Sequence, residues 1–456
     1  MNTRIHNLEE ENYFMSLSLD GTRQTLVTSL KKSYSELNKL REKYDLKTKR
    51  NNITALHSVL GDISEESAII IPITTSKGTV VFVLSSECET VSGENVLFID
   101  HFDNAKIDSY LGGDAHDNGW LKKYLSYRSN NSLLGRGIAF EKWKKSIYPI
   151  SERLWFDLLK PISEHIKELG ITKVLFVLSG ELQVLPVTSA RYLKKEKYHY
   201  FADEFQISFL PSLLSFSALR GRKSSQKSSS LIIGVGDYKY QPKLNYATHE
   251  AQVVGKIFNT VPILDTKASR QFITKNISDK AYFHFAGHGL FAWGNEPLSS
   301  ALILLNKEKI TLAEVLGKMD LSGTMLVTLS ACETGLIDLT RSPDEFIGFQ
   351  TGFIHAGCAN VLSSLWTVDD FSTAILMNKF YQLHIAEKLP IPISLHKAQC
   401  WIRKKTRREI GEYVINEMPI PHLAKVIAYA DIMNGDLDQK VYEHPYYWAA
   451  FTITGI

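Results

Sequence analysis

Two short segments contain the residues whose types and spacing could do chemistry: His-Phe-Ala-Gly-His-Gly at 284–289 and Ser-Ala-Cys-Glu-Thr-Gly at 330–335. Each follows an apolar, β-prone run, so each is expected where a strand ends. If the two strands are neighbours in a parallel sheet, His288 and Cys332 open onto the same carboxyl edge, where open α/β sheets bind ligands. A thiolate is a nucleophile and an imidazole can keep it ionised, so this pair suits cysteine-based acyl transfer.

We interpret His288 as catalytic because it lies between Gly287 and Gly289, whose missing side chains let a substrate backbone approach closely. His284 lies inside the apolar run and is expected to be a hydrogen-bonded core residue or a support to the site. A zinc site made of His284, His288 and Cys332 is the rival interpretation. Its spacing disfavours it, because the familiar pair of ligands four residues apart works on one helix face.

The remaining cysteines, Cys88, Cys358 and Cys400, are interpreted as small apolar core residues. For Cys332 the context favours exposure instead, since small residues precede it and a turn follows. The four thiols have neither disulfide-scaffold nor metal-ligand spacing, which is typical of a reducing cytoplasm. We therefore predict no metal.

No nucleotide-binding signature stands out either. Gly234 and Gly236 lack the third glycine of a dinucleotide loop, whose position holds Lys239, and a phosphate loop of the form Gly-x-x-x-x-Gly-Lys is missing. A structural turn is the favoured interpretation of this glycine pair. We expect no cofactor.

The order of the two motifs resembles that of the CHAT peptidase family, relatives of caspases and separase. Three later segments extend the resemblance, and the last is similar to the family's final strand: Ala-Gly-Cys-Ala at 356–359, Ser-Leu-Trp-Thr-Val-Asp-Asp at 364–370 and His-Pro-Tyr-Tyr-Trp-Ala-Ala-Phe at 444–451. The resemblance covers roughly residues 60–456 and is specific in the second half. It implies a caspase-like sheet, with His288 as general acid or base and Cys332 as nucleophile.

The resemblance also implies where an oxyanion would be held. In caspase-like enzymes the donors resemble the backbone N–H groups of the nucleophile and of the glycine after the catalytic histidine, here Cys332 and Gly289. The family does not demand a third triad member. A backbone carbonyl could orient His288 instead.

Asp369 and Asp370 have two interpretations, which stay open here. Paired acids after a strand usually cap the next helix, expected from about residue 371 to 381. Resemblance to separase implies instead an aspartate in the pocket for a basic residue. Asp370 is the better-aligned position.

The predicted fold is α/β: a caspase-like, doubly wound, mostly parallel sheet flanked by helices. The predicted parts are an N-terminal helical segment (1–60), a non-catalytic α/β lobe (61–220), a small, polar linker (221–230) and a catalytic domain (231–456). The N-terminal segment carries an apolar stripe at helical spacing, which packs either on this chain or on a partner: Leu26, Leu30, Tyr34, Leu37, Leu40 and Tyr44.

Individual elements follow from periodicity. The sequence predicts strands at 67–73, 79–84, 96–99, 172–178 and 231–236, helices at 147–169, 247–258 and 311–318, and a charged, mostly helical insertion at 404–442.

Composition excludes little. The formal net charge of +3 on 456 residues favours neither nucleic acid nor membrane as a direct partner. No apolar run approaches the ~20 residues that span a bilayer, and no secretory signal is visible.

We expect a cytoplasmic cysteine endopeptidase that cleaves a protein substrate after a basic residue, in bacterial signalling or defence, and that is regulated by an activating protein partner. The alternative is a catalytically silent signalling scaffold of the same fold.

Overall fold

The computed structural model describes most of the chain: residues 60, 63–88, 91, 93–113, 117, 119–220, 222, 229–292, 297–331, 333–335 and 348–456. The expected N-terminal segment with its apolar stripe, most of the linker at 221–230, and Cys332 lie outside the described residues.

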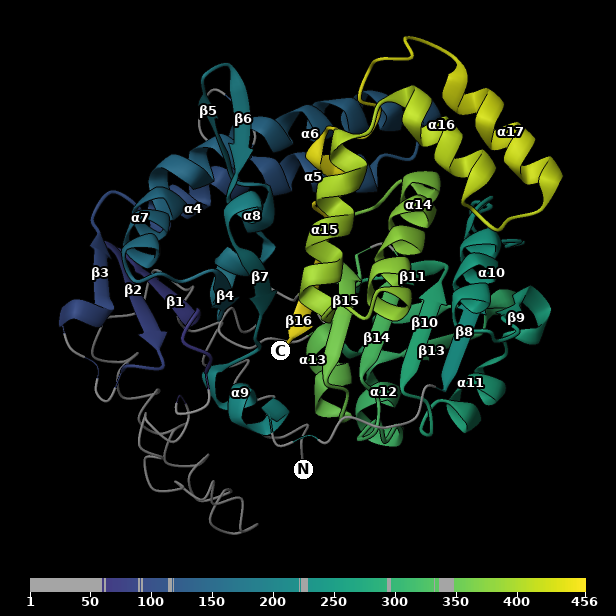
Figure 1. Ribbon diagram of the computed structural model, residues 1–456, viewed down its shortest axis with the longest axis horizontal. Helices are drawn as coiled ribbons and strands as arrows, with labels where there is room; N and C mark the ends of the chain where they lie inside the picture. The colour runs from purple at the N-terminus through teal and green to yellow at the C-terminus, as the bar shows by residue number, and fades with distance from the viewer. Residues whose placement is uncertain are drawn as a thin grey trace, which may run out of the picture.

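An 11-stranded sheet runs through the molecule (Figure 1) in the order β3-β2-β1-β4-β7-β16-β15-β14-β10-β8-β9. Most neighbours are parallel; the antiparallel pairs are β3 with β2, β2 with β1, and β15 with β16. The strands are β1 (Ser67–Thr75), β2 (Gly78–Ser85), β3 (Val96–Ile99), β4 (Lys173–Phe176), β7 (Gln206–Phe209), β8 (Ser230–Gly234), β9 (Ile263–Leu264), β10 (Tyr282–Ala286), β14 (Leu326–Ser330), β15 (Asn360–Ser364) and β16 (Phe451–Gly455).

The last strand of the chain is the seam of this sheet. β16 pairs antiparallel with β15 and parallel with β7, so it joins the strands of the predicted non-catalytic lobe to those of the predicted catalytic domain. β7, β4 and β1 therefore run opposite to β15, β14, β10 and β8. The sheet is continuous across the predicted boundary at 221–230.

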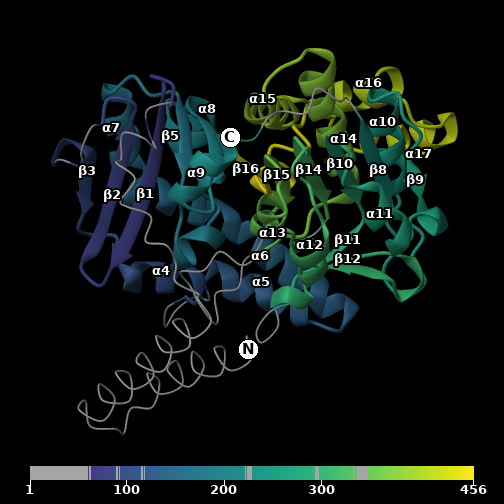
Figure 2. The same cartoon turned by 90° about the horizontal axis from the view of Figure 1, so that it is seen from below.

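Helices cover both faces of the second half of the sheet, as a doubly wound fold requires (Figure 2). Alternate residues of β8 belong to separate cores: Ile232 lies in the core that includes buried residues of α10 (Ala247–Ile257), α14 (Asp370–Tyr381) and α15 (Ile391–Lys404), while Ile233 lies in the core that includes buried residues of α11 (Arg270–Asn276), α12 (Leu312–Lys318) and α13 (Phe349–His355). This alternation follows from the two-residue period of a strand. The predicted fold class is confirmed.

The smaller elements complete the fold. They are α4 (Asn104–Leu111), α5 (Trp120–Ser129), α6 (Leu133–Leu154), α7 (Lys160–Glu168), α8 (Phe201–Glu204), α9 (Leu213–Arg220), α16 (Arg407–Asn416) and α17 (His422–Met433), the hairpin β5 (Arg191–Lys194) and β6 (Lys197–Tyr200), and a three-stranded sheet of β11 (His288–Leu290), β12 (Ala301–Ile303) and β13 (Lys309–Thr311). The helical insertion expected at 404–442 is confirmed by α16 and α17. So is the capped helix expected at 311–318, because Thr311 and Glu314 form a capping box on α12.

Two expectations need correction. The helix expected at 147–169 starts earlier, at Leu133, where Ser132 caps it, and continues through a π-helical turn into α7. The segment 444–451 is mostly not a strand: Pro445–Tyr447 forms a 3-10 turn, and β16 begins only at Phe451. Proline has no N–H to donate to a ladder, and the carbonyl of Tyr446 instead accepts from Trp366 Nε1 at 3.1 Å.

Helices α5 and α6 form a hairpin that crosses from the first half of the molecule to the second (Figure 2). Their aromatic rings pack on the loop after β15 and on the segment before β16. Ring centroids lie 4.8 Å apart for Tyr124 and Trp143, 6.2 Å for Trp120 and Trp366, and 5.9 Å for Trp143 and Tyr446. This aromatic cluster links the two halves of the sheet.

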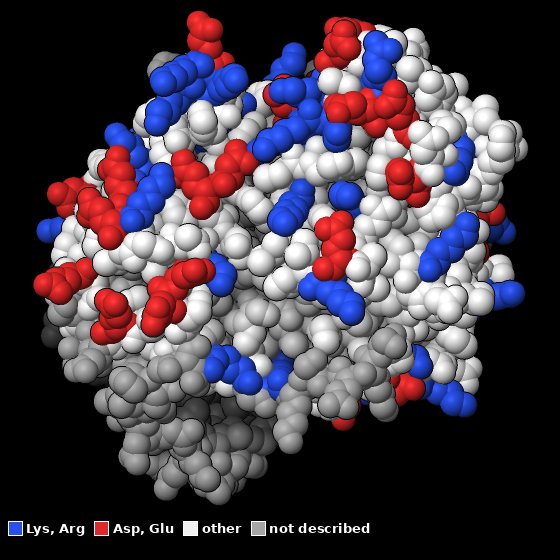
Figure 3. Space-filling view, in the orientation of Figure 1, with Lys and Arg blue, Asp and Glu red and all other residues white. Residues whose placement is uncertain are grey.

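Charge on the surface is mixed. Figure 3 shows Lys and Arg interspersed with Asp and Glu over the face drawn, in keeping with the small net charge. Among the described residues, no helix is both long and apolar enough to cross a membrane.

Truncation of the buried Trp143 tests whether the aromatic cluster joins the halves. Trp143→Ala is expected to lower the free energy of unfolding by about 3–5 kcal/mol, the usual cost of removing a buried aromatic ring. Because the cluster spans both halves, urea denaturation followed by circular dichroism should keep a single transition. Leu134→Ala, on the exposed face of the same helix, should change stability by less than about 0.5 kcal/mol. A second transition that Trp143→Ala leaves unmoved would contradict this view.

Candidate active site

The site is organised by the parallel pairing of β10 with β14. Ala286 lies opposite Ser330 at the carboxyl ends of the two strands, and the N–H of Gly287 donates to the carbonyl of Ser330 at 3.2 Å. The prediction that these strands are parallel neighbours is confirmed. His288 and position 332 therefore each follow a paired strand end by two residues.

Cys332 itself lies outside the described residues, but the residues on both sides of it are described. Ala331 and Glu333 are both buried, and Glu333 has a backbone φ of 62°. The two residues that flank the candidate nucleophile are thus both packed inside the molecule.

His288 is oriented by a backbone carbonyl. Its Nε2 lies 2.7 Å from the carbonyl oxygen of Pro242, which can only accept, so Nε2 carries a hydrogen. In a neutral ring Nδ1 is then the acceptor. The backbone N–H of His288 donates to the hydroxyl of Tyr238 at 3.0 Å, and the two rings lie 4.6 Å apart. Burial lowers the pKa of His288, which favours the neutral imidazole.

The glycines beside His288 have different reasons to be small. A Cβ on Gly287 would lie 2.8 Å from the Tyr238 hydroxyl and 2.9 Å from the ring of Phe285, so this glycine serves internal packing. Gly289 lies on β11, opposite Leu302 of β12, and β11 is the edge strand of its small sheet. Internal packing thus requires a glycine at 287, and the expectation that these glycines make room for a substrate stays a prediction.

His284 is a core residue, as expected. Its side chain is fully buried, with Nε2 at 3.0 Å from a carboxylate oxygen of Glu250 and Nδ1 at 3.3 Å from the hydroxyl of Tyr381. The Tyr381 hydroxyl continues to Thr328 Oγ1 at 2.7 Å. This network ties β10 and β14 to α10 and α14 beneath the site. The described part of the chain contains no cluster of three or more His, Cys, Asp or Glu side chains that could hold a metal ion.

Glu333 has partners that sequence reasoning missed. Arg128 Nε lies 2.8 Å from its carboxylate, and the hydroxyl of Tyr124 donates to the same group at 2.6 Å. The Tyr124 hydroxyl also accepts from the backbone N–H of Thr367 at 3.1 Å. Glu333 stands directly after Cys332 in the motif, which is the one sequence signal that could have singled it out, but nothing local points to residues on α5.

Asp369 and Asp370 differ in what they contact. Asp369 is the N-cap of α14 and accepts from the N–H of Ser372 at 2.8 Å, so the capping interpretation is confirmed for it. Asp370 accepts from the backbone N–H of Tyr246 at 2.7 Å, on the loop that also carries Pro242. Burial raises the pKa of Asp370 to about 7, and the negative charges of Glu250 and Asp369 add to the rise.

Comparison with known proteins identifies the family. The family model of the CHAT domain matches residues 149–456. The chain belongs to the CHAT domain family. The matched region begins inside α6 and is shorter than the range of roughly 60–456 that the resemblance suggested. A search of curated proteins found no match.

The crystal structure of separase shares the fold of this CHAT protein. Separase of Saccharomyces cerevisiae, in a crystal structure of the separase–securin complex, aligns with 88% of this chain at 10% identity and a TM-score of 0.50. The aligned part is 30% of the separase chain, so this CHAT protein matches under a third of that molecule. The Arg-specific cysteine proteinase gingipain R aligns with 68% of this chain and 67% of its own, at 10% identity and a TM-score of 0.40. At this identity the separase match establishes the shared caspase-like fold.

Cys358 and Cys400 are poor nucleophiles. Cys358 is fully buried, which raises the pKa of its thiol to about 12. Cys400 lies 3.8 Å from Nε2 of His396 and 3.4 Å from Asp203, yet burial raises its pKa to about 11, so the thiol stays protonated at neutral pH. Cys400 is half-buried, so the core interpretation is wrong for it, whereas Cys88 and Cys358 are buried as expected.

The raised pKa of Asp370 predicts a pH-dependent stability. An unfolded aspartate titrates near pH ~3.9, so between about pH 4 and 7 the folded protein holds the extra proton and loses stability as pH rises. Relative to Asp370→Asn, the wild type should lose at most about 1.4 kcal/mol of unfolding free energy per pH unit in that window, and nothing further above it. Urea denaturation at stepped pH measures this. Asp237→Asn, an exposed carboxyl, is the control, and parallel profiles for wild type and Asp370→Asn would contradict the assignment.

Proposed function

We propose that this CHAT protein is a cysteine endopeptidase, with Cys332 as nucleophile and His288 as general acid and base. The observation that carries the proposal is the pairing of β10 with β14, together with a His288 ring held by the Pro242 carbonyl so that Nδ1 is left as the acceptor. A catalytic imidazole needs that combination of fixed orientation and an available nitrogen.

The proposed reaction is a two-step acyl transfer. His288 takes the proton of the Cys332 thiol, the thiolate attacks the carbonyl carbon of the peptide bond, and His288 gives that proton to the departing amine as the C–N bond breaks. Water, deprotonated by His288, then attacks the thioester and releases the acid and the thiolate. We assign the developing oxyanion to the backbone N–H groups of Gly289 and Cys332; the place of Gly289 on an edge strand supports this assignment.

The alternative is a silent scaffold of the same fold. Such a protein would need neither a histidine oriented by a carbonyl nor a cysteine in the matching position. The orientation of His288 therefore favours an enzyme.

We assign to Asp370 the recognition of a basic residue on the amino side of the cut bond. Its carboxyl lies at the sheet edge that carries the loop of Pro242, and Asp369 already caps the helix, so Asp370 is not needed as a cap. With a pKa of about 7 the group is charged in roughly half the molecules at neutral pH. A bound guanidinium would favour the charged form through charge-assisted hydrogen bonds.

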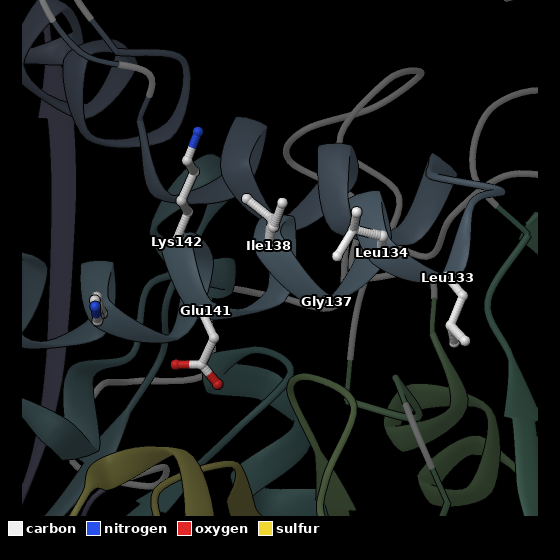
Figure 4. Close-up of a pocket in the computed structure, with 7 residues that line it drawn as sticks. Leu133, Leu134, Gly137, Ile138, Glu141 and Lys142 are labelled. Carbon is white, nitrogen blue, oxygen red and sulfur yellow. The ribbon is translucent and has the colours of Figure 1, made fainter.

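A regulatory protein partner belongs to the same proposal. The outer face of α6 exposes Leu133 (92%) and Leu134 (77%) beside Ile138, around a hollow of about 630 Å³ that Lys142, Lys145 and one acid, Glu141, also line (Figure 4). An acidic amphipathic helix fits both the apolar surface and the two lysines. The cytoplasmic, bacterial signalling or defence setting rests on the family resemblance alone.

Removal of either catalytic group should abolish cleavage. Cys332→Ala and His288→Ala are each expected to lower kcat/KM by ~10³-fold or more, since members of a catalytic unit act together. Cys400→Ala is the matched control, because it removes a thiol that sits beside a histidine but is protonated. Peptide-library digestion read by mass spectrometry measures the rates. Full activity of Cys332→Ala would end the peptidase assignment at this site.

Substrate preference tests Asp370. Asp370→Asn should reduce cleavage after Arg by about ten- to a hundredfold, the value of one hydrogen bond to a charged group. Because the carboxyl titrates near neutrality, wild-type preference for Arg should strengthen from pH 6 to 8. Asp369→Asn is the matched comparison, since Asn also caps helices, and its effect should be smaller. A preference for acidic or apolar residues would refute the role.

A further inference from the structure

The residue after the candidate nucleophile is held in an unusual state. Glu333 is 1% exposed, and its φ of 62° is in the left-handed region that residues with a Cβ adopt rarely. Such conformations persist only where surrounding contacts over-determine them, and they gather at functional sites. A change in this φ angle, which is rotation about the N–Cα bond of Glu333, would redirect the peptide that joins Glu333 to position 332.

The contacts that hold Glu333 come from the far half of the chain. Arg128 approaches the carboxylate with two nitrogens, Nε at 2.8 Å and Nη2 at 3.4 Å, on different oxygens. Tyr124 donates its hydroxyl at 2.6 Å and accepts from the N–H of Thr367 with the same oxygen. Both side chains lie on α5, so one helix ties together the turns that follow β14 and β15.

Because Glu333 is buried, its carboxylate needs the hydrogen bonds from Arg128 and Tyr124. A carboxylate removed from water is tolerated only when it is paired and hydrogen-bonded, and the fork of an arginine fits it in two places. The positive charge of Arg128 also helps to lower the pKa of His288, so the guanidinium acts electrostatically on the candidate catalytic histidine. Arg128 thus acts on the histidine and is bonded to the neighbour of the nucleophile.

We propose that Arg128 and Tyr124 are positioning residues, which hold Glu333 and thereby fix the backbone of the residue that directly follows the candidate nucleophile. The inference rests on the proposed function for its effect on catalysis. It makes α5, outside the region matched by the CHAT family model, part of the active site.

The test is a pair of variants with a readout that does not depend on cleavage. Arg128→Met combined with Glu333→Gln removes both charges of this ion pair together, so neither is left buried without the other. We expect this double variant to keep the wild-type melting midpoint within a few degrees. Alkylation of Cys332 by iodoacetamide at pH 7, followed by peptide mass spectrometry, should slow about tenfold or more. With a cleavable peptide, kcat should fall ~10²-fold while KM changes little, because small misplacements cost rate.

Two further variants sharpen the result. Tyr124→Phe keeps both charges but removes the hydroxyl that donates to Glu333 and accepts from Thr367, so it should still fold, with a modest loss of stability, and show a smaller loss of the same kind. Lys122→Met, an exposed cation on the same helix, is the control for charge and should behave as wild type.

The outcomes separate the two proposals. A wild type that cleaves no peptide but alkylates rapidly at Cys332, with slowing in the double variant, supports positioning and refutes the peptidase. Wild-type alkylation rates and wild-type kcat in the double variant would overturn positioning. So would a loss that only follows the loss of folded protein in circular dichroism.

Discussion

The structure depends on a thin seam at its centre. β16 pairs along its length with β15, but it shares a single residue pair, Thr454 opposite Phe209, with β7. A ladder bond contributes only about 0.5–1.5 kcal/mol net. Each aromatic ring of the α5–α6 hairpin buries ~150–250 Å², which at about 25 cal/mol per Å² is several kcal/mol. The hairpin therefore contributes more to joining the halves than the single pair between β16 and β7, alongside contacts such as that of Arg403 on α15 with Asp203 on α8.

That constraint reaches the candidate active site directly. The same helix that contributes Trp120 and Tyr124 to the aromatic cluster delivers Arg128 to Glu333. The packing between the halves and the alignment of the candidate site therefore both depend on α5. A substitution that loosens the hairpin is expected to shift the turn after β14, even if it contacts neither candidate catalytic side chain.

Buried charges in this fold behave according to what faces them. Glu333 contacts Arg128 and Tyr124, and His284 contacts Glu250. Asp370 accepts hydrogen bonds from the backbone of Tyr246 and Asn245, but it is buried and has two other acids nearby, and its pKa is raised accordingly. A buried carboxyl whose pKa is raised is suited to bind a cation when it is deprotonated. The proposed preference for a basic residue is therefore linked to pH.

The sequence by itself determined the fold class, the family and the two strand ends that carry His288 and Cys332, because strand periodicity and short motifs are local signals. It also predicted that a carbonyl could orient His288, but not that the carbonyl belongs to Pro242, since a backbone carbonyl has no sequence signature. Tertiary structure alone decided that α5 reaches Glu333 and that 444–450 is not a strand. Those features come from side chains about two hundred residues apart and from packing around Trp366, and no local pattern encodes a distant partner.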